Sequence, residues 1–339
     1  MNESCNNQRV SRWLRNGLVM VASVFVLDRY YEYKTNFPIE PIYSNVTYTG
    51  KPLGIYYLDM PYNWRPADQL VDAEGFGMMR VNGRLFRQPV EHCELIFDAY
   101  HQYAQTHSQE DARKVTHLAD LLVGEMKQVE LGNRECTVLW YNFPWMSHNR
   151  PWISAMAQGF AMSALCRAYE VEPEPNYLNK AKACMAVFDI DLKDGGVLSH
   201  DPQGNLYYEE YAIPGKADHV LNGFIYCLLG LYDLHRATGD MKAKELFDNG
   251  VKTLSTPGVL ERYDQGFWTT YDQSSFHYPS FNYSAIHIRQ LIVLYNITGK
   301  QVFKDIAEKW RRYNLEHKYR IQFFVWGSWK RVMIKIKGL

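Results

Sequence analysis

The residue types best suited to chemistry lie in two short stretches that precede apolar helices. Glu209, Glu210 and Tyr211 are consecutive, and Tyr271 and Tyr283 flank the next such stretch. A carboxylate is a competent general base. A tyrosine, with an ordinary pKa near 10, is a competent acid, and it becomes a base where a cation lowers that pKa. The combination predicts a site that moves protons.

Paired carboxylates are also typical of glycoside hydrolases. Adjacent residues of a strand point to opposite faces, so we expect Glu209 and Glu210 not to share a site. One acid with several tyrosines fits proton transfer at carbon better than hydrolysis of a glycosidic bond. No Ser/His/Asp arrangement, Gly-rich phosphate loop or metal-ligand spacing stands out, so we expect neither a metal nor a cofactor.

A repeat of about 63 residues positions these candidates. Mostly apolar helices are expected to end near Tyr169, Tyr232 and Tyr295, which are 63 residues apart. A turn and an amphipathic helix follow each one, and a helix pair at 90–126 fits the same scheme. A repeat of this length suits helical hairpins arranged in a ring, with buried inner helices and amphipathic outer ones. The predicted fold is therefore mainly α, an (α/α) toroid.

Short β-hairpins are expected at the rim of this toroid. The segment Met78–Phe86 carries an Asn-Gly turn, which is a strong hairpin signal. Two further hairpins are predicted at Gly196–Tyr208 and Val259–Tyr271, whose second strands end 63 residues apart.

Polar residues recur inside the predicted inner helices. Gln158, Asn222 and His287 are 64 and 65 residues apart, each about one turn inside its helix. A buried polar side chain without a partner costs free energy. Each could be a satisfied core residue, but three in register favour a polar cavity at the end of the toroid where the inner helices begin.

The composition of the chain narrows the classes of molecule that it could bind. Lys+Arg and Asp+Glu balance at 37 each, so net charge does not indicate a nucleic-acid partner. Aromatic residues make up 15% of the chain, with 25 Tyr and 9 Trp. Such rings stack on sugar faces, so we expect a carbohydrate ligand, with the ring-rich segment Trp140–Trp152 as a platform.

Four segments are expected along the chain. Residues 1–40 contain an apolar run after Arg9, Arg12 and Arg15 that is too short to span a bilayer and lacks a cleavage site, which favours a helix packed on the body or on a membrane surface. On this reading a cytoplasmic or membrane-peripheral location is favoured over secretion. Residues 41–88 are extended with a hairpin that contributes to the cleft, and 89–316 form the toroid. The basic tail 317–339 is expected to be an edge strand or a surface-binding arm.

Several of these segments are familiar together. The chain resembles the C-terminal domain of the D-glucuronyl 5-epimerases, which convert glucuronate to iduronate in heparosan, the backbone of heparin and heparan sulfate. The resemblance covers roughly 150–315, and a weaker likeness extends to 80–100. Its matching segments are Trp152–Gly159, Tyr208–Tyr211, Val220–Leu234, Tyr271-Asp272, and Tyr283 with His287–Leu291.

The resemblance implies an (α/α) toroid and a set of site residues. The catalytic residues would be Glu210, Tyr271 and Tyr283, with Tyr211 beside them, and the substrate contacts Asn222 and Tyr226. We add Gln158, His287 and Trp152 as expected substrate contacts. An arginine that the family carries shortly after the position of Tyr271 is absent here, and the substitutes we expect to bind the uronate carboxylate are Arg80, Arg84 and Arg87.

The expected reaction is inversion of carbon 5 of a glucuronate in a heparosan-like polysaccharide, by removal and return of one proton. A homodimer is allowed by the resemblance, and no nucleic acid is expected as partner. The alternatives on the same scaffold are a uronate lyase, a glycoside hydrolase and a sugar-binding module without activity.

Overall fold

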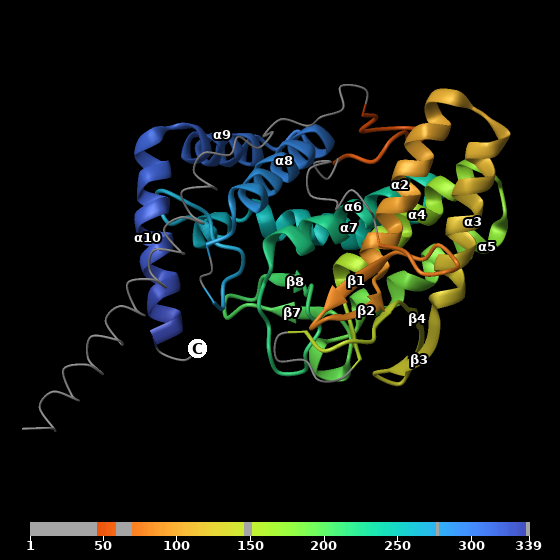
Figure 1. The fold of residues 1–339 in the computed structure, drawn as a ribbon, viewed down its shortest axis with the longest axis horizontal. Helices are drawn as coiled ribbons and strands as arrows, with labels where there is room; N and C mark the ends of the chain where they lie inside the picture. Colours follow the sequence, from red (N-terminus) through yellow and green to blue (C-terminus); the bar gives the residue numbers. More distant parts are fainter. Residues whose placement is uncertain (1–45, 59–69, 146–150, 276–277, 337–339) are drawn as a thin grey trace, which may run out of the picture.

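The computed structural model describes residues 46–58, 70–145, 151–275 and 278–336. These residues are mainly helical, in the order shown in Figure 1. The helices are α2 (Pro89–Thr106), α3 (Gln109–Glu125), α4 (Ala155–Val171), α5 (Pro175–Ala183), α6 (Leu221–Thr238), α7 (Met241–Ser255), α8 (Phe281–Thr298), α9 (Gln301–Leu315) and α10 (His317–Ile336). The strands pair antiparallel as β1 (Met78–Val81) with β2 (Arg84–Arg87), β3 (Lys127–Leu131) with β4 (Arg134–Val138), β5 (Trp140–Tyr141) with β6 (Trp152–Ile153), and β7 (Leu198–His200) with β8 (Leu206–Tyr208). The predicted segment 1–40 lies outside the described residues.

Successive helical hairpins build the (α/α) toroid that the repeat predicts. Inner helices contact one another in the order α2, α4, α6 and α8, and each packs against the outer helix that follows it. The pairs succeed one another across the molecule from α2 and α3 to α8 and α9, and the strand pairs gather on one side of them (Figure 1). Helices α4, α6 and α8 are buried along most of their length, whereas α7 and α9 bury only one face.

Two glycines let the inner helices α4 and α6 pack backbone against backbone. A Cβ on Gly230 would lie 2.1 Å from the carbonyl oxygen of Gly159, and a Cβ on Gly159 would lie 2.5 Å from Cα of Cys227. Real Cβ atoms do not approach this closely, so a side chain at either position would force the helices apart. The close packing of α4 and α6 fixes the position of their first turns relative to each other, and the site residues project from these turns.

A buried ion pair joins the same two helices away from those ends. Arg167 of α4 donates to Asp233 of α6 at 2.6 Å, and both side chains are fully buried. Asp233 also accepts hydrogen bonds from Tyr57 and Ser163, so its carboxylate is well satisfied. Removing one partner of such a pair leaves an uncompensated buried charge, which typically costs about 3–5 kcal/mol.

The rim is partly as predicted. Strands β1 and β2 form the expected hairpin, with Asn82 and Gly83 at positive φ in its turn, and β7 and β8 form the second. The third predicted hairpin, Val259–Tyr271, is wrong. Its first half is a 3-10 helix at Leu260–Tyr263, and the sole ladder contact within that segment is an isolated bridge between Asp264 and Thr269.

The segment Val259–Tyr271 does not form a hairpin because its side chains bond and pack against α9 and α10. The Asp264 carboxylate accepts hydrogen bonds from Trp310 and Tyr313 of α9, which draw the turn onto that helix. The buried Trp268 ring stacks on Phe323 of α10 at 4.1 Å instead of facing a strand. An edge strand in the basic tail is likewise wrong, because α10 is helical from His317 to Ile336.

Candidate active site

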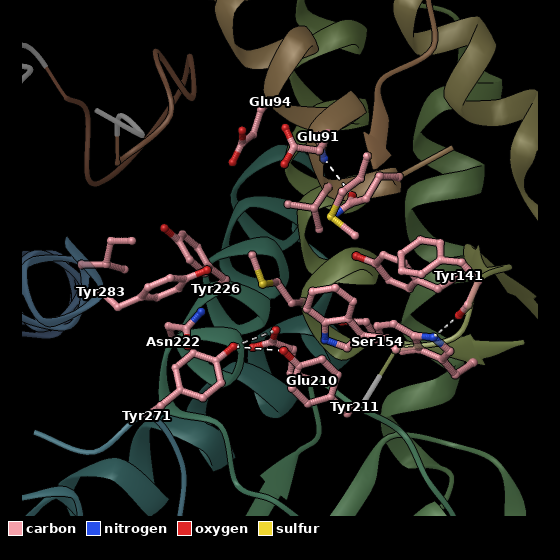
Figure 2. Close-up of a pocket in the computed structure, with 18 residues that line it drawn as sticks. Glu91, Glu94, Tyr141, Ser154, Glu210, Tyr211, Asn222, Tyr226, Tyr271 and Tyr283 are labelled. Carbon is pink, nitrogen blue, oxygen red and sulfur yellow. Dashed lines mark hydrogen bonds between the residues drawn. The ribbon is translucent and has the colours of Figure 1, made fainter. Parts of the chain in front are cut away.

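A cavity of about 260 Å³ opens where the inner helices begin. Its walls come from the first turns of α2, α4, α6 and α8, from the β5–β6 pair, and from the loops after β8 and before α8 (Figure 2). The lining residues are Met79, Gln88, Val90, Glu91, Glu94, Tyr141, Phe143, Trp145, Trp152, Ser154, Met156, Glu210, Tyr211, Asn222, Tyr226, Tyr271, Tyr283 and Ile286.

Backbone hydrogen bonds fix Glu210 at the floor of this cavity. The amide of Ala155 donates to the carbonyl of Glu209 at 3.0 Å, and the amide of Ala212 donates to that of Ile153 at 3.2 Å, so the segment around Glu210 is tied to β6 and α4. Its carboxylate rests on Gly223 in the first turn of α6, where a Cβ would lie 2.2 Å from Oε2. Glycine at 223 therefore leaves the space that the carboxylate occupies.

The surroundings of Glu210 suit a proton acceptor that works near neutral pH. Burial raises the pKa of this carboxyl to about 7, against the opposing effect of the nearby Tyr211 and Tyr271 hydroxyls, and the charges of Glu209 and Asp272 raise it further. Oε2 is buried and has no hydrogen-bond partner among the described residues. A general base is most effective when its pKa lies near the working pH.

Three phenols surround this carboxylate. The Tyr271 hydroxyl donates to Glu210 Oε1 at 3.3 Å and shares a hydrogen bond with the Tyr211 hydroxyl at 3.1 Å. The Tyr283 ring lies edge-on to that of Tyr271, with centroids 5.6 Å apart. Figure 2 shows Glu210, Tyr211 and Tyr271 together on one side of the cavity and Tyr283 entering from α8. The structure thus brings all four expected catalytic residues to one cavity.

The phenols are held in the protonated form. Burial raises the pKa of Tyr283 to about 12, and it raises the pKa values of Tyr211 and Tyr271 well above 10, with the neighbouring Glu210 charge acting in the same direction. No lysine, arginine or histidine stands among the described residues that line the cavity. At neutral pH these tyrosines can therefore donate protons, whereas Glu210 can accept one.

Glu209 does not line the cavity, as expected, but it and Glu210 lie just beyond the end of β8 at Tyr208 and not within a strand. Its carboxylate is fully buried and accepts hydrogen bonds from Ser199, from the backbone amides of Asp218 and His219, and from Nδ1 of His219. His219 holds a positive φ of 53° at this point. Glu209 thus anchors the loop that leads into α6. At the end of this loop the amide of Leu221 donates to the carbonyl of Tyr271 at 3.2 Å, so the anchored loop also holds the backbone of Tyr271.

Three of the expected substrate contacts also line the cavity. They are Trp152, Asn222 and Tyr226. Trp152 stacks on Tyr141 with centroids 4.1 Å apart, which makes a two-ring wall. Oδ1 of Asn222 is buried and has no hydrogen-bond partner in the described part of the chain.

Gln158 and His287 are not among the lining residues. Gln158 exchanges hydrogen bonds with the backbone of Leu139, which ties the β4–β5 connection to α4. His287 is buried beside Thr269 and Trp310, and burial lowers its pKa to about 3, so it is neutral. The three residues in register do not share one cavity, because only Asn222 reaches it. Gln158 is a satisfied core residue, the alternative that the sequence left open.

The hairpin arginines do not line the cavity either. Arg80 bonds the carbonyl of Gly83 in its own turn, and Arg84 is exposed. Arg87 is engaged with three carboxylates, those of Asp72, Glu74 and Glu125. Acids of the loop before β1 and of α3 hold Arg87 away from the cavity, and the spacing in the sequence does not reveal this.

Two acids that line the cavity were not predicted from the sequence. Glu91 and Glu94, in the first turns of α2, line the cavity on the side opposite Glu210 (Figure 2). A signal was present, since Glu94 interrupts a helix whose neighbouring positions Cys93, Ile96 and Phe97 are buried. A buried acid on the inner face of a helix that begins at the mouth is a candidate for the site.

Comparison with known proteins decides the family. The family described as D-glucuronyl C5-epimerase C-terminus matches residues 135–312, which is more than half of the chain. The chain belongs to this family. Glu210, Tyr211, Asn222, Tyr226, Tyr271 and Tyr283 all lie inside the matched range.

Two curated relatives illustrate the family. The chain is 31% identical over 192 residues to an uncharacterized protein of Methanocaldococcus jannaschii, a match that covers 55% of this chain and 61% of the relative. It is 35% identical over 181 residues to a D-glucuronyl C5-epimerase of Caenorhabditis elegans, covering 48% of this chain and 29% of that enzyme. The chain thus spans less than two thirds of the length of both relatives.

Solved structures resemble the chain only loosely. A cellobiose 2-epimerase from Bacillus thermoamylovorans aligns with a TM-score of 0.46 at 12% identity, over 70% of this chain and 63% of that one. A family 76 glycoside hydrolase (mannosidase) from Bacteroides thetaiotaomicron aligns with a TM-score of 0.41 at 14% identity, over 67% and 62%. Similarity at this level has no bearing on substrate or reaction.

Proposed function

We propose that this chain inverts carbon 5 of D-glucuronate to L-iduronate within a heparosan-like glycosaminoglycan. The observation that carries the proposal is the pairing of Glu210 with protonated tyrosines in one cavity, inside the part of the chain that matches the epimerase family. Inversion at carbon requires a base on one face and an acid on the other, and a carboxylate that titrates near neutral pH and a protonated phenol can fill these two roles.

The proposed reaction moves two protons. The Glu210 carboxylate takes the proton from carbon 5, and the electron pair of the broken C–H bond delocalises into the uronate carboxylate. Tyr283 then gives its phenolic proton to the opposite face of carbon 5. The enzyme is left with a neutral Glu210 and an ionised Tyr283, which is the state that the reverse reaction needs.

Hydrogen-bond donors must stabilise the negative charge that develops on the uronate carboxylate. We assign this role to Tyr271 and Tyr211, whose hydroxyls form a hydrogen-bonded chain to Glu210 in the same cavity. Asn222 and Tyr226 line the same cavity and are the further polar contacts that we assign to the sugar. Burial of these side chains lowers the local dielectric constant, which strengthens each of these interactions.

Incubation with heparosan in heavy water, followed by proton NMR, tests the function. An epimerase incorporates deuterium at carbon 5 and produces iduronate signals. A lyase would instead give an unsaturated uronate that absorbs in the ultraviolet, and a hydrolase would raise the number of reducing ends. Either of those outcomes, or binding without change, would refute the proposal.

Two variants test the residue assignment. Glu210→Gln and Tyr283→Phe keep the shapes of the side chains but remove the acceptor and the donor. Each should lower deuterium incorporation at carbon 5 by at least about 100-fold, while the far-ultraviolet circular dichroism stays that of the parent. Parental exchange in both variants would contradict the assignment even if the chain is an epimerase.

A further inference from the structure

Helix α10 is fixed to the body by one of its faces. Phe323 is fully buried, stacks on Trp268 and lies edge-on to Phe281 with centroids 5.1 Å apart. The guanidinium of Arg320 lies 4.8 Å from the centroid of the same Phe281 ring. These contacts set which side of the helix turns outward.

The outward side carries an apolar stripe. Ile321, Val325, Trp326 and Trp329 are 52%, 52%, 54% and 59% exposed, and Leu315, just before the helix, is 54% exposed. Residues three and four apart lie next to one another on a helix, so these side chains form one surface. A soluble surface rarely gathers large apolar side chains in this way unless something covers them.

The sequence of this last segment carries charge of one sign. From His317 to the last residue of the chain there are six lysines and arginines and not one aspartate or glutamate. Lys318 at the start of the helix is 61% exposed and pairs at 3.0 Å with Glu316, the residue just before the helix. A helix with tryptophan and aliphatic residues on one face and basic residues around them is typical of segments that lie in a membrane interface.

We propose that α10 docks on an anionic lipid surface and lies in the plane of the interface. Trp326 and Trp329 would enter the boundary between headgroups and acyl chains, and the basic side chains would contact the headgroups. A nucleic acid fits less well, because the exposed centre of the face is apolar where phosphates would need cations. A search of the described residues finds no helix with the length and hydropathy of a membrane span.

Vesicle sedimentation with the full chain tests the proposal. Vesicles of phosphatidylcholine with about a third phosphatidylserine should pellet the protein, and pure phosphatidylcholine vesicles should retain it about tenfold less well. Trp326→Ser combined with Trp329→Ser should weaken binding to the anionic vesicles by about tenfold or more. The matched control is Val71→Ser combined with Met241→Ser, which removes two exposed apolar side chains elsewhere and should leave binding unchanged.

Three results would overturn the proposal. The first is absence of the parent chain from the anionic pellet at low salt. The second is equal binding by the parent and the tryptophan double variant when both show the same melting temperature. The third is concentration-dependent self-association that the double variant abolishes while vesicles pellet neither protein, since a second copy would then cover the face.

Discussion

Replacing Glu210 by glutamine should stabilise the fold while it abolishes the chemistry. Burial raises the pKa of this carboxyl from its ordinary 4.5 to about 7. The folded protein therefore binds a proton at Glu210 more tightly than the unfolded chain does. Between pH 4.5 and about 7 the folded state carries more of this proton, so stability falls as the pH rises through that window.

The magnitude follows from the same shift. Above pH 7 the buried charge costs the fold about 3 kcal/mol at most, because a tenfold change in proton affinity corresponds to about 1.4 kcal/mol. A glutamine has no charge to bury and can still accept the hydrogen bond of Tyr271. We expect Glu210→Gln to raise the free energy of unfolding by about 1–3 kcal/mol at pH 8 and by less than about 1 kcal/mol at pH 5.

Urea unfolding of both proteins at the two pH values measures this difference. A variant that is less stable than the parent at pH 8 would refute the reasoning, and so would a stability gain of the same size at both pH values. The first result would mean that the Glu210 carboxylate is held by contacts worth more than its burial costs. The second would mean that its charge is not the cause.

The remaining predictions concern the same carboxylate. If its ionised form is the base, the rate of carbon-5 exchange should rise about tenfold between pH 6 and pH 8 with a midpoint near 7, and a flat profile over that range would contradict this. Gly223→Ala should lower carbon-5 exchange sharply, because the added Cβ would displace Oε2 of Glu210. The matched helical substitution Gly124→Ala, whose Cβ meets no atom within 4 Å, should leave exchange unchanged. Equal loss in both variants would contradict the packing argument. Glu209→Gln should move the midpoint of the pH profile to lower pH, because the charge of Glu209 raises the pKa of Glu210, and a midpoint that stays or rises would show that this charge does not act on the site.

Much of the architecture was predictable because it repeats. The 63-residue steps between Tyr169, Tyr232 and Tyr295 predict where three inner helices end. Helices α4 and α8 end within three residues of Tyr169 and Tyr295, whereas α6 continues six residues past Tyr232. Asn82 and Gly83 both favour the positive φ angles of a two-residue turn, so the β1–β2 hairpin could be predicted locally. The segment Val259–Tyr271 could not, because tertiary hydrogen bonds from α9 to Asp264 decide its shape.

The site was predictable where the repeat decides position. It brings Glu210, Tyr271 and Tyr283 to the same end of the toroid, and the expected separation of Glu209 from Glu210 holds although both lie beyond the end of β8 at Tyr208. A polar helix residue reaches the cavity only if its side chain is turned toward it about the helix axis. Equivalent positions in the repeat do not fix that direction, so the sequence could not show that Gln158 and His287 point elsewhere.

The two cavity acids of α2 could not be predicted for a different reason. Glu91 and Glu94 come from the first helical hairpin, outside the three repeats whose spacing was regular. Their approach to Glu210 depends on how that hairpin closes onto α4, and the sequence gives no measure of this.

A crystal structure of Glu210→Gln with a heparosan oligosaccharide bound would show directly whether the two side chains flank carbon 5. We expect a glucuronate ring in the cavity, with the side chain at 210 and the Tyr283 hydroxyl on opposite faces of carbon 5, each about 3–3.5 Å from it. A ring that presents the same face of carbon 5 to both side chains, or a sugar bound away from them, would contradict it.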